Sequence, residues 1–265
     1  MLVWSSLGRA FTFAATLLLF ALLYGLPIGV IALASVAGQW NGVWPSMLTF
    51  AHYANAMRGD SFDLLRVSLA TGLLASAAAL VCGTWAALAL RRFRPLPKRL
   101  LDAVFFIPSA VPSVSVGLGL LVAFSKPPVL LNGTTLIVLI AHFVLVSAFS
   151  YGNVAAGLAR IPADFEQVAE SLGARPFYRL RRVTLPLVAP YLIAAFSLSI
   201  ALSMGELGAT VMVYPPGWVT LPVGIFTLSD RGAIFDAAAL TMVLAFTTLI
   251  VLVALARIST KAAAR

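Results

Sequence analysis

Residues 166–186 read EQVAESLGARPFYRLRRVTLP and form the densest run of charge in a chain of 265 residues. Hydrophobic residues make up 61% of the whole chain and charged residues only 10%. Apolar runs long enough to cross a hydrocarbon core of ~30 Å stand on both sides of this stretch. We therefore predict that it is a polar loop between two membrane spans.

Six apolar runs predict an all-α, polytopic membrane protein with a single transmembrane domain over residues 1–265. The runs lie at about residues 11–37, 63–90, 101–124, 134–153, 187–212 and 234–256. The first run is too long for the apolar segment of a secretory signal peptide, so we expect it to be retained as a span. An even number of spans places both termini on one side of the membrane.

The distribution of basic residues predicts the orientation. The net charge is +9, but Lys and Arg occur in short clusters between apolar runs, which points to topology and the lipid bilayer and not to nucleic acid. With a cytoplasmic N-terminus, 14 of the 18 basic residues lie on the inner side, chiefly in segments 91–99, 160–182 and 257–265. The positive-inside rule thus favours cytoplasmic termini.

The loop at about residues 160–190 has the pattern of two short helices joined by a glycine turn. Glu166 suits a first helical turn, and Gly173 suits a left-handed C-terminal cap. Pro176 is expected to start a second helix, which Pro186 and Pro190 are expected to end.

Three interpretations of this loop follow from its two faces. Apolar residues recur at helical spacing at 165, 168, 169 and 172, and arginines recur at 175, 179 and 182. The loop could be a solvated segment near anionic headgroups, an interfacial amphipathic helix, or an element that docks into a groove on a cytoplasmic partner.

The spacing Gln167-Val168-Ala169, three residues, Gly173, nine residues and Val183-x-Leu185-Pro186 resembles the EAA loop of binding-protein-dependent ABC importer permeases. That family pattern is Glu-Ala-Ala, three residues, Gly, nine residues, Ile-x-Leu-Pro. Here Gln167 replaces the usual Glu, with Glu166 adjacent, and Val168 replaces the first Ala. These departures leave open whether the motif's acid makes a specific salt bridge.

The resemblance implies that the loop is a coupling element seated on a separate ATP-binding subunit in the cytoplasm. The residues it assigns to coupling are Glu166, Gln167, Ala169, Gly173, Ala174, Arg175, Arg179, Leu185 and Pro186. It also implies a bacterial inner-membrane location, a periplasmic substrate-binding protein and a second permease subunit, with a heterodimer favoured. The chain contains no GxxxxGK[ST] phosphate loop, so we expect ATP hydrolysis in the partner, no cofactor here and no enzyme activity.

Glu206 is the only formally charged residue deep in a predicted span. Burying a charge in hydrocarbon costs about 2.5–3.5 kcal/mol even on permissive scales, so this acid should face a cavity or a partner. The alternative is that it braces a helix break at Gly205 and Gly208. Pro108 and Pro112 predict a bend in the third span, which either packs closely or lines the translocation pathway.

Residues 205–222 together with Ser229-Asp-Arg-Gly232 resemble permeases of phosphonate, iron, thiosulfate and molybdate importers, most closely those for 2-aminoethylphosphonate. Such a substrate carries an ammonium group that an acid in the pathway could attract. A secondary transporter driven by an ion gradient is the alternative from another class, although one intramembrane acid gives it little support.

The remaining polar residues suggest structural roles. His52 and His142 have no companion ligands at metal-site spacing, so we expect packing or interface histidines and no metal. Asp102 is expected to pair with Arg99 or to lie among the headgroups. HExxH and GxSxG motifs are missing from the sequence, which argues against a membrane enzyme.

Overall fold

The computed structural model describes residues 5–91, 93–162 and 164–263. Arg92 and Arg265, both counted above on the inner side, lie outside these ranges. The chain divides into two compact parts, residues 1–62 with 225–243 and residues 63–224 with 244–265, and each is described by itself. That residues 1–265 form a single transmembrane domain stays a prediction.

The first part begins with a helical run that contains one π-helical segment and continues into a small hairpin. Its elements are α1 (Ser6–Phe20), η1 (Ala21–Gly25), α2 (Leu26–Ala34), β1 (Ala37–Gln39), β2 (Ser46–Leu48) and α3 (Ala51–Ala56). The strands pair antiparallel, with Ala37 opposite Leu48. A Cβ atom at Gly38 would lie 2.4 Å from the Met47 carbonyl oxygen, so the pairing requires glycine there.

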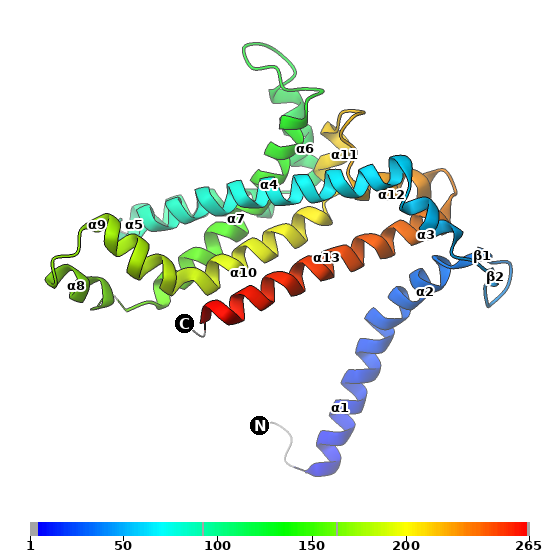
Figure 1. Ribbon diagram of the computed structural model, residues 1–265, viewed down its shortest axis with the longest axis horizontal. Helices are drawn as coiled ribbons and strands as arrows, with labels where there is room; N and C mark the ends of the chain where they lie inside the picture. Colours follow the sequence, from blue (N-terminus) through cyan, green and yellow to red (C-terminus); the bar gives the residue numbers. More distant parts are fainter. Residues whose placement is uncertain (1–4, 92, 163, 264–265) are drawn as a thin grey trace. The chain divides into compact units, whose positions relative to one another are not determined.

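The second part holds most of the helices (Figure 1). Those before the polar loop are α4 (Gly59–Leu90), α5 (Pro95–Ala110), α6 (Ser113–Ala123) and α7 (Thr135–Arg160). The loop and the chain after it form α8 (Asp164–Ser171), α9 (Pro176–Arg179), the π-helical η2 (Leu180–Thr184), α10 (Leu185–Met204), α11 (Gly208–Val213), α12 (Leu221–Asp230) and α13 (Ile234–Ala263). Helices α4, α12 and α13 extend across both parts.

Within the described residues, five helices are long and apolar enough to cross a membrane, and the bent pair α5–α6 brings the number to six. This confirms the mostly helical fold with five to six candidate spans. The helices extend beyond the predicted apolar runs, as where α7 continues to Arg160, because helical hydrogen bonding does not stop where hydrophobicity does.

The core of the second part lies where α4, α7 and α10 meet. Tyr151, Val154 and Leu158 of α7 pack there with residues of the two neighbouring helices, among them Ala87 of α4 and Val188 of α10. A Cβ at Gly83 of α4 would lie 2.9 Å from the Tyr151 amide nitrogen, so glycine permits this close approach. A tight helix packing of this kind is typical of membrane interiors.

The third predicted span is bent by 101° between α5 and α6. Val111 and Pro112 are both extended, and Pro112 precedes the first residue of α6. The predicted bend is therefore confirmed, because proline removes the hydrogen bonds that a straight helix would need.

The fifth predicted span, 187–212, contains a helix break near Gly205 and Gly208, where the sequence suggested one. Helix α10 ends at Met204, and α11 starts at Gly208 after a short break. Ala209 and Val213 of α11 pack with Ile137, Val138 and Ala141 of α7, so the segment after the break buries an apolar face.

The prediction that Pro186 and Pro190 end the second short helix is wrong. One helical run continues from Pro176 to Met204, with Pro186 in the first turn of α10 and Pro190 inside it. The π-helical turn η2 immediately precedes Pro186. Since a π turn widens the hydrogen-bond ladder locally, it can accommodate prolines that would clash in a regular α-helix.

Candidate functional site

The polar loop forms two helices around a glycine turn, as predicted. Gly173 has φ +79°, the left-handed conformation that favours glycine. The Gly173 amide donates to the Glu170 carbonyl at 2.9 Å, and the Ala174 amide donates to the Ala169 carbonyl at 3.0 Å. This pair of bonds is a Schellman cap, which ends α8 and turns the chain toward α9.

Glu166 is held by two groups from outside α8. Its Oε1 accepts a hydrogen bond from the Thr184 hydroxyl at 2.7 Å, and its Oε2 forms an ion pair with the Arg91 guanidinium. Burial alone would raise the pKa of this carboxyl, but the bonds from Thr184 and Arg91 and the charges of Arg91 and Arg179 outweigh it and lower the pKa. Glu166 is therefore ionised at neutral pH, and the stabilisation from these contacts is lost only on acidification through that lowered pKa.

A second ion pair joins the two short helices to each other. Arg179 of α9 contacts Glu170 of α8. The Glu170 side chain is 67% exposed, whereas that of Arg179 is 16% exposed. Arg175 is exposed and has no ion pair within the described part of the chain.

The other residues assigned to coupling lie on or beside the same loop. Gln167 and Pro186 are exposed, whereas Ala169, Ala174 and Leu185 are partly buried. The apolar face of α8 is open, with Phe165, Val168 and Leu172 exposed, and Phe177 of α9 is exposed as well. Exposed apolar side chains on a short amphipathic helix are typical of a docking surface.

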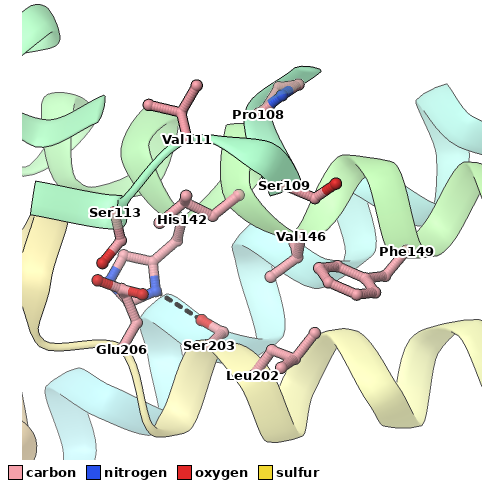
Figure 2. Close-up of a pocket in the computed structure, with 11 residues that line it drawn as sticks. Pro108, Ser109, Val111, Ser113, His142, Val146, Phe149, Leu202, Ser203 and Glu206 are labelled. Carbon is pink, nitrogen blue, oxygen red and sulfur yellow. Dashed lines mark hydrogen bonds between the residues drawn. The ribbon is translucent and has the colours of Figure 1, made fainter. Parts of the chain in front are cut away.

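A second site lies where the bent helices meet the break after α10. A cavity of about 190 Å³ is lined by Pro108, Ser109, Val111, Ser113, His142, Leu145, Val146, Phe149, Leu202, Ser203 and Glu206. Figure 2 shows the Glu206 side chain beside those of Ser113 and His142 in this cavity. Pro108 and Glu206 thus line the same cavity. Pro112 follows the lining residue Val111 in the chain but does not itself line the cavity.

Glu206 caps α11 as well as facing the cavity. Its Oε1 accepts a hydrogen bond from the Ala209 amide at 2.7 Å, which satisfies a free N–H at the start of the helix. The bracing alternative is therefore supported by a contact, and it does not exclude a role toward the cavity.

The two glycines at this break differ in how tightly they are packed. A Cβ at Gly208 would lie 2.3 Å from the Ser113 hydroxyl oxygen, whereas one at Gly205 would meet nothing closer than 3.8 Å. Glycine at position 208 is thus needed for α11 to approach α6, whereas packing does not require glycine at position 205.

His142 is a buried structural histidine that ties three helices together. Its Nδ1 lies 2.6 Å from the Ser203 hydroxyl of α10, and its Nε2 lies 2.8 Å from the Thr210 hydroxyl of α11. The expected packing role is confirmed, and Ser203 and Thr210 are partners that the sequence analysis missed.

His52 and Asp102 also have defined partners. His52 Nδ1 lies 2.7 Å from Asp236 Oδ1, and its Nε2 lies 3.1 Å from the Ala37 carbonyl oxygen. The expected pair of Asp102 with Arg99 does not form within the described residues; the Asp102 carboxylate instead accepts a hydrogen bond from the buried Tyr151 hydroxyl. A place for Asp102 among the headgroups stays a prediction. The sequence did not indicate this pair, since the two residues are 49 positions apart.

Comparison with known families gives a direct match. Residues 79–263 match the family described as "Binding-protein-dependent transport system inner membrane component". The matched segment includes the polar loop, the bend between α5 and α6, and the break after α10.

Two relatives span nearly all of the chain. It is 56% identical over 259 residues to the "Putative 2-aminoethylphosphonate transport system permease protein PhnV" of Salmonella paratyphi A, covering 98% of each sequence. It is 27% identical over 237 residues to the "Spermidine/putrescine transport system permease protein PotC" of Escherichia coli K12, covering 89% of each.

Solved structures share the fold. A chain of a bacterial ABC transporter for import of the acidic polysaccharide alginate superposes with a TM-score of 0.77 at 15% identity, covering 96% of this chain and 95% of that one. A chain of the MetNI methionine ABC transporter in an inward-facing conformation gives 0.64 at 17% identity, covering 78% and 99%.

These matches remove the alternative of a secondary transporter driven by an ion gradient. They also agree with a role in transport and not in catalysis, and with partners that include an ATPase and a periplasmic binding protein. The chain therefore belongs to the family of inner membrane components of binding-protein-dependent transport systems, and it is a multi-pass permease subunit of an ABC importer.

Proposed function

We propose that this permease imports 2-aminoethylphosphonate or a closely related phosphonate. The observation that carries the proposal is the 56% identity, over 98% of both sequences, to a permease named for 2-aminoethylphosphonate transport. The aligned 259 residues amount to 98% of this chain, and 56% identity over that length is far above the 15–17% shared with the solved structures of the same fold.

The cavity near Glu206 supports a place for this substrate in the pathway. We assign Glu206, Gly205, Gly208, Pro108 and Pro112 to the pathway or its gate. The bend and the break leave non-helical backbone inside the membrane, which proteins tolerate where it lines a cavity. A carboxylate there would attract the ammonium end of an aminophosphonate, and Oε1 would still cap α11.

The partners and the topology complete the proposal. A second permease subunit, a different chain and not a copy, forms the pathway with this one, and ATPases bind the loop at about residues 160–190. Both termini and this loop face the cytoplasm of a bacterial cell. Support comes from the exposed apolar face of α8 and from the basic residues near the loop.

Uptake with defined competitors tests the substrate. Cells that lack their own phosphonate uptake would express this permease with its binding protein, its ATPase and any second permease. We expect uptake of radiolabelled 2-aminoethylphosphonate to be inhibited by the unlabelled compound and not by putrescine, iron, thiosulfate or molybdate. Absence of 2-aminoethylphosphonate uptake, with transport of one of the others, would refute the substrate assignment.

Single-cysteine labelling tests the topology. Once Cys82 is replaced, a cysteine at position 45 or 217 should react with an impermeant reagent from outside the cell. A cysteine at position 178, whose native Tyr178 side chain is exposed, should react only from inside. Labelling of position 178 from outside would contradict both the orientation and the docking role of the loop.

A further inference from the structure

We propose that Arg91, Glu166 and Thr184 form a brace that fixes the first coupling helix to two membrane spans, so that Arg91 and Thr184 are positioning residues for transport. Arg91 directly follows α4, Glu166 lies in α8 and Thr184 ends η2. Glu166 is 75 positions from Arg91 and 18 positions from Thr184 along the chain. In this proposal the acid of the loop acts inside the permease and is not a contact to the ATPase.

The contacts use both oxygens of the Glu166 carboxylate. Arg91 binds Oε2 and Thr184 binds Oε1, and the Glu166 side chain is only 23% exposed. Thr184 is itself 3% exposed. Each carboxylate oxygen thus already contacts a group of this chain, and the low exposure of Glu166 limits the access of a partner, whereas the neighbouring Gln167 is exposed.

The end of α4 is not held to α9 and η2 by close packing of side chains. A cavity of about 430 Å³ lies between the end of α4 and the second short helix; it is lined by Trp85, Leu88, Ala89, Arg91, Glu166, Pro176, Phe177, Arg179, Leu180 and Thr184. The α4 residues around Arg91 therefore stand apart from α9 and η2 across open space. The ion pair and the hydrogen bond bridge this gap.

The position of Thr184 explains how movement would pass through the brace. Thr184 is the last residue of the π-helical turn, directly before α10 begins at Leu185. Arg91 directly follows the last residue of α4, Leu90. Displacement of α8 would thus pull on the ends of two spans at once, and π-helical turns are frequent at sites where helices must adjust.

The test compares charge removal, charge exchange and a matched control in the assembled transporter. Arg91→Ala and Glu166→Gln should each reduce uptake about tenfold, within the usual 5- to 150-fold range of coupling between sites. The ATPase should still copurify with both variants. Amide hydrogen exchange of residues 164–171 should speed up, while that of α7 should not change.

The exchange Arg91→Glu with Glu166→Arg should restore most of the uptake, because the ion pair forms again with its signs reversed. Glu170→Gln is the matched control, since it removes a carboxylate one turn further along α8 whose ion pair stays within the loop. It should leave uptake close to the parental rate. An exchanged pair that reaches the membrane yet remains as inactive as the single variants would overturn the brace.

If the exchanged chain does not accumulate in the membrane, the Thr184 variants test the brace instead. Thr184→Ser keeps the hydroxyl and should behave as the parent, whereas Thr184→Val should accelerate exchange in α8 and reduce uptake. Equal behaviour of the two would overturn the proposal. Because hydrogen exchange and ATPase retention need no substrate, these readouts judge the brace even if the parental transporter does not take up 2-aminoethylphosphonate.

Discussion

The polar loop at about residues 160–190 and the cavity near Glu206 use polar residues in opposite ways. In the loop, charged side chains connect separate helices while the apolar face of α8 stays exposed. Around the cavity, His142 is buried with both ring nitrogens bonded to hydroxyls, and Glu206 caps a helix. The loop thus leaves an apolar face open, which suits its proposed docking to another protein, whereas the polar groups at the cavity are satisfied within the chain.

This difference predicts how each region responds to substitution. Changes in the loop should leave the chain folded and impair its cooperation with partners. Changes at the cavity should disturb the local fold, since packing and polar contacts coincide there. The following substitutions test that contrast, in order of decreasing expected effect.

Gly173→Asp should have the largest effect on transport. A non-glycine residue at φ +79° is disfavoured by about 1 kcal/mol, and the aspartate would add a bulky charge to the docking surface. A Cβ at this position meets no other atom of the permease within 4 Å, so the chain itself should not clash. We expect normal membrane insertion, loss of uptake and reduced ATPase retention, measured on membranes and on the purified complex.

Gly173→Ala provides the control for Gly173→Asp, because it shares the backbone strain and lacks the charge. It should retain more uptake than the aspartate variant. If the aspartate variant transports at the parental rate with its ATPase bound, the loop is not the coupling element.

Gly208→Ala should be the most damaging change at the cavity. Its methyl group would lie 2.3 Å from the Ser113 hydroxyl oxygen and 2.9 Å from Val114 Cγ2, so α11 would have to move away from α6. Overpacking of this kind typically costs about 1–3 kcal/mol. We expect a lower melting temperature in detergent together with reduced uptake.

Gly205→Ala is the matched substitution three residues earlier. Gly205 has φ −93° and no close neighbour in the path of a Cβ, so alanine should fit with little change in melting temperature. Equal destabilisation by the two alanines would show that the break depends on backbone flexibility and not on the approach of α6 and α11.

The sequence predicted features that depend on local physical rules. Hydrophobic runs long enough to cross the membrane indicated the spans. Gly173 indicated the turn because glycine permits a left-handed backbone, and Pro112 indicated the bend because proline lacks the N–H that a helix needs. The loop motif also predicted the family, which the match over residues 79–263 confirms.

Features that depend on contacts between distant residues were not predictable from one sequence. The partners of Glu166, His142 and Asp102 lie between 18 and 75 positions away, and nothing in their local sequence identifies them. The prediction that the helix ends at Pro186 failed for a related reason. Proline rules describe regular α-helices, and the π-helical turn before Pro186 is not regular.

Glu206→Gln should have an intermediate effect that separates the cap from the charge. The glutamine oxygen can still accept the hydrogen bond from Ala209, so α11 should remain capped and the melting temperature should stay close to the parental value. If the charge acts on the substrate or on the gate, uptake should fall or its competitor profile should change.

Glu206→Ala is the comparison for the glutamine variant. It removes both the charge and the cap, and loss of a cap typically costs about 1 kcal/mol. Normal uptake by Glu206→Gln, with destabilisation only in Glu206→Ala, would leave Glu206 with the bracing role alone.

The smallest expected effects distinguish two arginines of the loop. Arg175 is exposed and has no ion pair in the described part of the chain, so its charge is available to an acidic surface on the ATPase. Arg179 is engaged by Glu170, and its side chain is only 16% exposed.

Arg175→Glu should therefore weaken ATPase binding more than Arg179→Gln. The loss should shrink as salt rises, because exposed charges are screened beyond ~8 Å at physiological ionic strength. Arg179→Gln breaks a partly exposed ion pair, which is typically worth about 0–1 kcal/mol, and should show little salt dependence. Titration of the ATPase onto the purified permease at two salt concentrations measures both effects. A stronger and more salt-sensitive loss from Arg179→Gln would mean that Arg179 leaves Glu170 in the complex to bind the ATPase directly.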